Sequence, residues 1–189
     1  TINVGAVILS SGSETCNPER HDIHGYAKSK NIVTSLEFER MLSSSGPYGG
    51  HLVRPSDKKE PKKIAWLQCV GSRDEHIGAK GYCSAVCCTY AIKEAMLAKE
   101  HSAAPLDTVI FYMDIRTHGK DCEKYFNRGK EESGIRFIKS KITRIIPVAD
   151  DDSLFIQYID ETGKRVNETF DIVVLSIGFG TDKSTIDLA

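Results

Sequence analysis

Apolar residues in this chain gather in short continuous runs that are separated by polar segments rich in glycine. The runs with the length of buried strands are Ile64–Val70, Thr108–Met113, Ile135–Ile138 and Asp171–Ile177. Between them, Ser84–Glu100 and Asp121–Glu132 carry apolar residues at the spacing of a helix face. Strands that alternate with helices in this way predict a parallel sheet covered by helices.

After Lys141 the apolar residues recur at every second position. Apolar residues then alternate with polar ones as far as Phe170, with turn-forming segments at Asp150–Asp152 and Glu161–Gly163. This pattern predicts three short antiparallel strands before the last buried strand. The expected fold class is therefore α/β: a Rossmann-like three-layer domain whose last crossover is a β-meander.

The first third of the chain is less regular. Val4–Leu9 has strand length and leads into a turn, which predicts a buried strand. Thr34 or Ser35 is expected to cap a helix over Leu36–Leu42. Ser43–Lys63 is rich in Ser, Gly, Pro and Lys, and it is expected to be a long loop and a linker between two lobes.

Composition narrows the classes of function. The chain has 189 residues and a formal net charge of -1, so it has no overall field that would attract nucleic acid or an anionic membrane. No apolar run approaches the roughly 20 residues that span a bilayer, so direct membrane insertion is not expected. The chain begins at Thr1 and runs almost at once into an apolar segment, and we expect it to be a piece of a longer protein.

Cysteines give the most specific chemical signal. Four of the six lie within twenty residues of one another: Cys69, Cys83, Cys87 and Cys88. They occupy the end of a predicted strand and the start of a predicted helix, where a dinucleotide-binding fold carries its G-x-G-x-x-G loop. Because those glycines are missing, we expect a thiolate-bound centre here. Asp114 and Arg116, which follow the next predicted strand, are expected to brace this loop or the centre.

Three kinds of site suit four thiols at this spacing. Structural zinc usually takes its ligands from two short C-x2–4-C pairs, which are absent. Cys87 and Cys88 would point about 100° apart on a helix, and a four-cornered iron–sulfur cluster reaches both more easily than one ion does. The helix N-terminus also favours an anionic cluster. Reduced or redox-active thiols are the third possibility, and the isolated Cys16 and Cys122 are interpreted as structural.

Two further segments end apolar runs in serine and glycine: Ser10-Ser11-Gly12 and Ser176-Ile177-Gly178. Such segments are either ordinary turns or places where the edge of a sheet approaches a flavin. In the second case Ser11, Gly12 and Gly178 would contact the cofactor.

Longer stretches of the chain resemble one protein family. They are Ile64–Glu75 (IAWLQCVGSRDE), Gly81–Ala95 (GYCSAVCCTYAIKEA), Phe111–Lys120 (FYMDIRTHGK), Phe38–Leu42 (FERML) and Arg54–Lys63 (RPSDKKEPKK). Together they resemble the A subunits of heterodisulfide reductase and of the related quinone-interacting membrane-bound oxidoreductase. The combination of C-V-G-S-R-D with Y-C-S-x-x-C-C is highly specific, and the resemblance covers nearly the whole chain.

The resemblance implies a thioredoxin-reductase-like core, in which an FAD domain carries an inserted Rossmann-like domain. Residues 1–63 would be the end of one half of the FAD domain and a linker, residues 64–178 the inserted domain, and residues 179–189 the return toward the FAD domain. It also implies that Cys69, Cys83, Cys87 and Cys88 bind a 4Fe–4S cluster near the FAD. The rest of the FAD site lies outside the chain, so FAD is expected in the full-length protein.

On this resemblance, the expected function is to relay electrons between FAD and other iron–sulfur centres of a cytoplasmic, multi-subunit oxidoreductase. The expected partners are the other subunits of a heterodisulfide reductase-like or quinone-linked complex, and the isolated fragment is expected to be inactive. Electron transfer needs no general acid, base or nucleophile, so no catalytic residue is assigned. Two alternatives stay open: a zinc-bound or metal-free domain that docks partner subunits, and an NAD(P)H-binding domain, against which the missing glycine loop argues.

Overall fold

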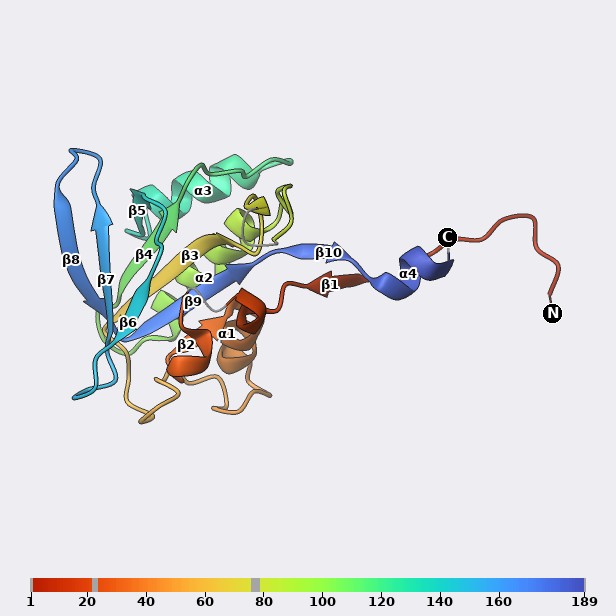
Figure 1. The fold of residues 1–189 in the computed structure, drawn as a ribbon. Helices are drawn as coiled ribbons and strands as arrows, with labels where there is room; N and C mark the ends of the chain where they lie inside the picture. Colours follow the sequence, from red (N-terminus) through yellow and green to blue (C-terminus); the bar gives the residue numbers. More distant parts are fainter. Residues whose placement is uncertain (1, 22–23, 76–78, 189) are drawn as a thin grey trace.

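The structure is a computed structural model that describes residues 2–21, 24–75 and 79–188 (Figure 1). Its strands are β1 (Ser13–Thr15), β2 (Ile32–Thr34), β3 (Lys63–Val70), β4 (Asp107–Tyr112), β5 (Arg136–Lys139), β6 (Ile145–Pro147), β7 (Leu154–Ile159), β8 (Arg165–Phe170), β9 (Ile172–Ile177) and β10 (Phe179–Thr181). Its helices are α1 (Ser35–Leu42), α2 (Cys87–His101), α3 (Cys122–Glu131) and α4 (Lys183–Leu188), with short 3-10 helices η1 (Pro18–His21) and η2 (Tyr26–Lys28).

The main sheet is parallel and has the strand order β2-β9-β3-β4-β5. β9 lies between β2 and β3, and all of its residues are buried. A central parallel strand is covered on both faces, which explains its continuous apolar sequence. The antiparallel strands β6, β7 and β8 follow β5 and lead into β9. The predicted α/β fold class with a parallel sheet is therefore confirmed.

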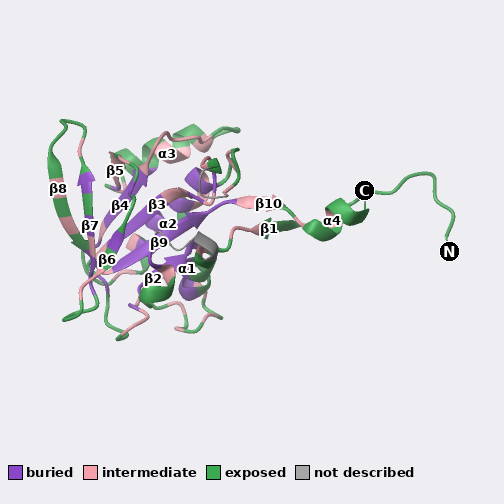
Figure 2. Ribbon diagram, viewed as in Figure 1, coloured by how far each residue is buried: buried purple, intermediate pink, exposed green. Residues whose placement is uncertain are grey.

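Successive residues of β3 point into two different cores. Ile64 and Trp66 pack with α1 and α2, whereas Ala65 and Leu67 pack on the other face with the β6–β7–β8 meander. All four are at most 2% exposed, and burying each large apolar side chain contributes about 1.5–3 kcal/mol. Figure 2 shows the buried residues concentrated in the sheet. The domain thus has a helix layer, a sheet layer and a meander layer.

A capping box begins α1 at Thr34, as the sequence predicted. Thr34 Oγ1 accepts a hydrogen bond from the Glu37 backbone N–H at 3.3 Å, and Glu37 Oε2 accepts one from the Thr34 backbone N–H at 2.7 Å. The described chain between α1 and β3 contains no helix or strand, as expected of a long loop. β2, which precedes this loop, pairs with β9 in the main sheet. The division of the chain at residue 63 stays a prediction.

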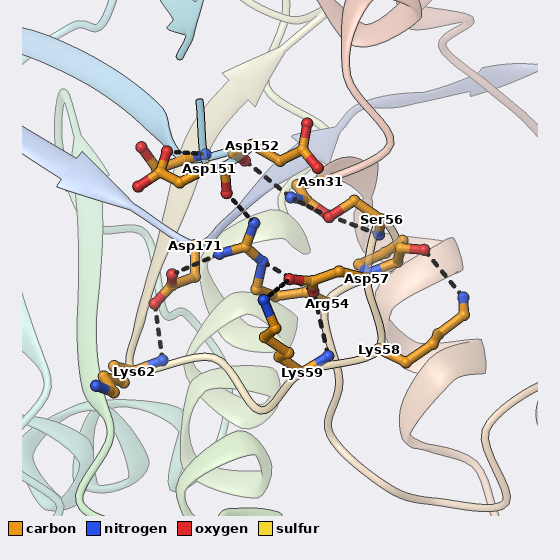
Figure 3. Close-up of polar contacts among 12 residues, drawn as sticks. Asn31, Arg54, Ser56, Asp57, Lys58, Lys59, Lys62, Asp151, Asp152 and Asp171 are labelled. Atoms are coloured by element: carbon orange, nitrogen blue, oxygen red, sulfur yellow. Dashed lines mark hydrogen bonds and ion pairs between the residues drawn. The ribbon is translucent and has the colours of Figure 1, made fainter. Parts of the chain in front are cut away.

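The long loop is fastened to the amino end of the sheet by Arg54, which is 8% exposed. Its guanidinium pairs with Asp171, just before β9, at 3.2 Å and donates to the backbone carbonyl of Asp151 in the β6–β7 turn (Figure 3). Asn31, just before β2, donates from its side chain to the carbonyl of Asp152 at 2.9 Å. These bonds join loop, meander and sheet at the end opposite the cysteines.

The prediction of a buried strand over Val4–Leu9 is wrong. This segment forms no strand, and its side chains are exposed, with Ile8 at 89% and Val7 at 75%. An apolar run becomes a buried strand only where neighbouring strands and covering layers enclose it. In the described ranges no strand pairs with this segment, and in Figure 1 it extends away from the layered domain.

Two short strands that the sequence pattern did not indicate form a ribbon beside the main sheet. β1 and β10 pair antiparallel, with Thr15 opposite Phe179 and Ser13 opposite Thr181. The chain therefore enters and leaves the layered domain side by side, and α4 follows the ribbon (Figure 1). Strands of three residues are too short to show a period. Across residues 2–21, 24–75 and 79–188, no helix has the length and apolar character needed to cross a bilayer.

Candidate functional site

A bulge near the end of β3 sets the direction of the Cys69 side chain. Leu67 pairs with Leu175 and Val70 pairs with Ile177, so β3 carries one residue more than β9 over this stretch. Cys69 lies within the bulge and has a left-handed φ of 64°. This conformation costs a non-glycine residue roughly 1–3 kcal/mol, so it persists only where the surrounding structure holds it.

The loop after the bulge is packed too closely for a side chain at Gly71. A Cβ on this residue, whose φ is 75°, would lie 2.0 Å from Sγ of Cys16. A Cβ on Gly178, at the end of β9, would likewise lie 2.0 Å from Oγ of Ser72. Cys16 is therefore a packing partner of the cysteine-bearing loop, which its isolation in the sequence did not indicate.

α2 begins at Cys87, three residues later than predicted, and Cys88 follows in its first turn. Val86 at the N-cap provides no side-chain hydrogen bond to the first backbone amides. Sγ of Cys87 lies 3.0 Å from Oγ of Ser84 and 3.7 Å from the carbonyl oxygen of Ile177. The helix therefore places two buried thiols beside an N-terminus that no side chain caps, where the partial charge is positive.

Cys83 approaches the site from the loop before α2, and Cys88 from the same turn of α2 as Cys87. Sγ of Cys83 accepts a hydrogen bond from the backbone N–H of Ala85 at 3.3 Å, and Ala85 has a left-handed φ of 63°. Sγ of Cys88 lies 3.9 Å from the carbonyl oxygen of Asp114, which follows β4. The four cysteines thus come from the end of β3, the loop before α2 and the first turn of α2.

One small pocket is lined by all four candidate ligands. Burial, together with the charges of the other three, raises the pKa of the Cys88 thiol to about 11. Burial also raises the pKa of Cys69, although the charge of Arg73 and a hydrogen bond from it oppose this effect. The structure therefore brings together Cys69, Cys83, Cys87 and Cys88, and their role as ligands stays a prediction.

Two arginines and one carboxylate form the rim of this pocket. Arg73 donates to Asp114 through both terminal nitrogens, and Arg116 donates to the same carboxylate at 3.1 and 3.3 Å. Burial raises the pKa of Asp114, but these hydrogen bonds outweigh it and hold the pKa below its usual value. Asp114 and Arg116 thus brace the loop, as the sequence predicted. The part that Arg73 plays was missed, because 41 residues separate it from Asp114.

The arrangement of the four thiols can be compared with the requirements of a single metal ion and of an iron–sulfur cluster. Within the described part of the chain, no group of three or more His, Cys, Asp or Glu side chains is placed to hold a single metal ion. Tetrahedral zinc requires every thiolate at about 2.3 Å from one centre, whereas a cluster requires thiols that surround a larger volume. All four thiols line one pocket, as either centre would require, and which of the two they bind stays a prediction.

The residues predicted to contact a flavin lie in two places. Gly178 is buried at the base of the ribbon, where its N–H donates to Val70 and its carbonyl accepts from the N–H of Cys16, both at 2.9 Å. Ser11 and Gly12 lie beyond the other end of β1. At ~3.4 Å per residue, they are ~14 Å or more from Gly178 along the ribbon. A flavin role for these three residues stays a prediction.

Comparison with known proteins gives relatives over nearly the whole chain, although no family model matches it. The iron–sulfur A subunit 2 of CoB–CoM heterodisulfide reductase from Methanopyrus kandleri is 44% identical over 93% of this chain. The corresponding iron–sulfur A subunit of Methanocaldococcus jannaschii is 39% identical over 94%. The A subunit of the H2/formate:CoB–CoM heterodisulfide,ferredoxin reductase of Methanococcus maripaludis is 39% identical over 100%. This chain covers 26–28% of these proteins, which is about a quarter of their length.

Solved structures give a likeness of fold. A 2-naphthoyl-CoA reductase aligns with a TM-score of 0.52 at 14% identity, over 94% of this chain and 21% of that one. Thioredoxin reductase of T. acidophilum aligns with a TM-score of 0.48 at 13% identity, over 89% of this chain and 42% of that one. The resemblance to the A subunit of heterodisulfide reductase is confirmed: over nearly its whole length, the chain is homologous to about a quarter of that subunit.

Proposed function

We propose that this chain is the part of a heterodisulfide reductase-like oxidoreductase that binds a 4Fe–4S cluster and relays electrons through it. The observation that carries the proposal is the pocket lined by Cys69, Cys83, Cys87 and Cys88 at the start of α2. When bound, such a cluster accepts and donates single electrons. The chain's own residues supply the four thiols, and the bulge in β3 and the first turn of α2 fix the positions of Cys69, Cys87 and Cys88.

The four cysteines are unevenly buried, as expected of a centre that relays electrons to a docked partner. Cys87 and Cys88 are each 6% exposed, so the side of the site next to the sheet excludes water. Cys69 and Cys83 are half-buried, so the other side lies near the surface. An electron donor or acceptor that docks on this side would reach the centre without rearrangement of the core.

We extend the proposal to the full-length protein. Two of the relatives are named iron–sulfur subunits, and we infer that the full-length protein binds FAD and works in the cytoplasm with the other subunits of such a complex. Residues 64–178 would form most of the inserted domain, to whose sheet β2 adds a strand from outside this range. Ser11, Gly12 and Gly178 would lie toward the FAD. A link to quinones is supported by the sequence resemblance alone.

An NAD(P)H-binding domain is the less favoured alternative, because of the loop after β3. A dinucleotide pyrophosphate needs glycines that let it approach the backbone at the helix N-terminus. Here the space beside Gly71 is filled by Cys16, and the helix N-terminus is occupied by thiols. A zinc-bound or metal-free docking domain is the other alternative, and it differs from the proposal in what the thiols bind.

Anaerobic reconstitution of the chain with iron and sulfide tests the proposal. We expect a broad thiolate–iron absorbance near about 400 nm that is lost in Cys83→Ser. Cys122→Ser is the matched control, because Cys122 opens α3 and does not line the pocket, and it should keep the band. Stoichiometric zinc without this band would contradict the proposal, and tight binding of NADH would favour the nucleotide alternative.

A further inference from the structure

Two positive charges lie at the rim of the thiol pocket, and one negative charge joins them. Arg73 and Arg116 both line the pocket, as does Asp114, to which both are paired. Two guanidinium groups and one carboxylate leave one positive charge in excess. An excess of positive charge beside four thiolates bears directly on how readily a centre held there accepts an electron.

Arg73 interacts directly with the thiol of Cys69. Its φ of 60° is left-handed, which costs a non-glycine residue roughly 1–3 kcal/mol. Its side chain is 21% exposed, although arginine is mostly an exposed residue. The guanidinium is bonded to Asp114, and both its charge and a hydrogen bond from it act on Cys69. The fold therefore maintains a strained backbone and a partly buried cation at this position.

Arg116 lines the same pocket. Its side chain is 40% exposed, it bonds to Asp114, and its charge interacts with that of Cys83. Asp74 in the cysteine-bearing loop pairs with Lys141 at 2.7 Å, and this pair is neutral. Among the described residues that line the thiol pocket, Arg73, Arg116 and Asp114 together leave one positive charge in excess.

We propose that Arg73 and Arg116 raise the reduction potential of the cluster bound by the four cysteines, while Asp114 positions both guanidinium groups and offsets part of their charge. This inference rests on the proposed function. It assigns to these three residues the tuning of the centre, in addition to the bracing of the loop.

The direction of the shift in reduction potential follows from the charge balance. Reduction adds one electron to the cluster and forms or breaks no bond, so the cluster and its thiolates become more negative by one charge. A nearby cation stabilises the reduced form more than the oxidised form, and a nearby carboxylate has the opposite effect. Because Arg73 is partly buried, solvent ions screen its charge less than that of a fully exposed residue.

Midpoint potentials of the reconstituted whole chain test the inference. The chain is titrated anaerobically with dithionite, and the reduced cluster is followed by electron paramagnetic resonance. Arg73→Gln should lower the equilibrium constant for reduction about tenfold, or ~59 mV for one electron. Arg73→Lys keeps a charge and should recover part of this shift, whereas Asp114→Asn should shift the potential upward. Lys124→Gln, an 86% exposed lysine on α3 outside the pocket, should leave it unchanged.

Opposite shifts in the arginine and aspartate variants distinguish an effect of charge from a general loss of structure. If Arg73→Gln binds no cluster, Arg116→Gln at the more exposed rim provides the same test and should also lower the potential. Loaded variants with the wild-type potential would overturn the inference and leave the proposed function intact. A wild-type chain that takes up no cluster would overturn both.

Discussion

The indole N–H of Trp66 donates a hydrogen bond to Oε2 of Glu94 at 2.9 Å, joining β3 to α2 inside the core. Trp66 is 0% exposed and Glu94 is 2% exposed. An ionised carboxylate at this depth loses its hydration, so burial raises the pKa of Glu94 to about 8. The bond to Trp66 favours the ionised form and reduces this shift without cancelling it.

Replacing Glu94 with glutamine should remove a pH dependence of stability. The carboxyl titrates near 4.5 when unfolded and about 8 when folded, so the folded state binds more protons between these values. The free energy of unfolding therefore falls as pH rises through this window. Glutamine keeps an acceptor for Trp66 and does not ionise. From about pH 4 to about pH 8, the stability of Glu94→Gln relative to wild type should rise by on the order of 3 kcal/mol.

Urea unfolding of both proteins at the two pH values measures this difference. A stability difference that is the same at both values would mean that Glu94 has an ordinary pKa in the folded protein, and it would contradict the expected desolvation.

Gly71→Ala should disrupt the cysteine-bearing loop, whereas Gly163→Ala should not. Both glycines have a left-handed φ, 75° and 82°, so alanine is strained at either position by about 1 kcal/mol. A Cβ at Gly163 meets nothing within 4 Å, but one at Gly71 would lie 2.0 Å from Sγ of Cys16. We expect Gly71→Ala to lose roughly 2–4 kcal/mol of stability and most of its iron uptake.

Thermal unfolding and iron content of the two alanine variants check this expectation. Equal stability and equal iron uptake in both would show that the packing of Cys16 against the loop has no importance for the site.

Arg54→Ala should destabilise the fold without acting on the cysteines. Its guanidinium bonds to Asp171 and Asp151 and also pairs with Asp57 at 3.3 Å. Removing this buried guanidinium takes away one partner of each of the Asp57 and Asp171 carboxylates and the donor to the Asp151 carbonyl. Because the carboxylates keep other partners and are partly exposed, the loss should cost roughly 2–4 kcal/mol. Lys59→Ala is the control, since Lys59 pairs with Asp57 but is 79% exposed, and it should change stability by less than about 0.5 kcal/mol.

Chemical denaturation measures both changes, and the absorbance of the reconstituted chain reports the site. An Arg54→Ala protein as stable as Lys59→Ala would show that the loop does not depend on this buried arginine.

The spacing of apolar residues along the chain predicted most of the fold. β9 is apolar except for Ser176 because both of its faces are covered, and the meander alternates because only one of its faces meets the sheet. Thr34 and Glu37 were recognisable as a cap because capping is a contact between neighbours in sequence. The cysteines stood out because of their crowding and their place at the start of a helix.

Contacts between distant segments were not predictable in the same way. Val4–Leu9 has the composition of a buried strand, but burial depends on what surrounds it, and the described chain provides no partner strand. The bulge that turns Cys69 is a property of the pairing between β3 and β9. The pairing of Arg73 with Asp114 and the packing of Cys16 on Gly71 likewise require the completed fold.

The iron, sulfide and zinc content of the purified, anaerobically reconstituted chain tests the central claim most directly. The 4Fe–4S assignment predicts four irons and four sulfides per chain in the wild type and no zinc, with the iron lost when any one of Cys69, Cys83, Cys87 or Cys88 is replaced by serine. One zinc per chain, or full iron content in two or more of these serine variants, would contradict it.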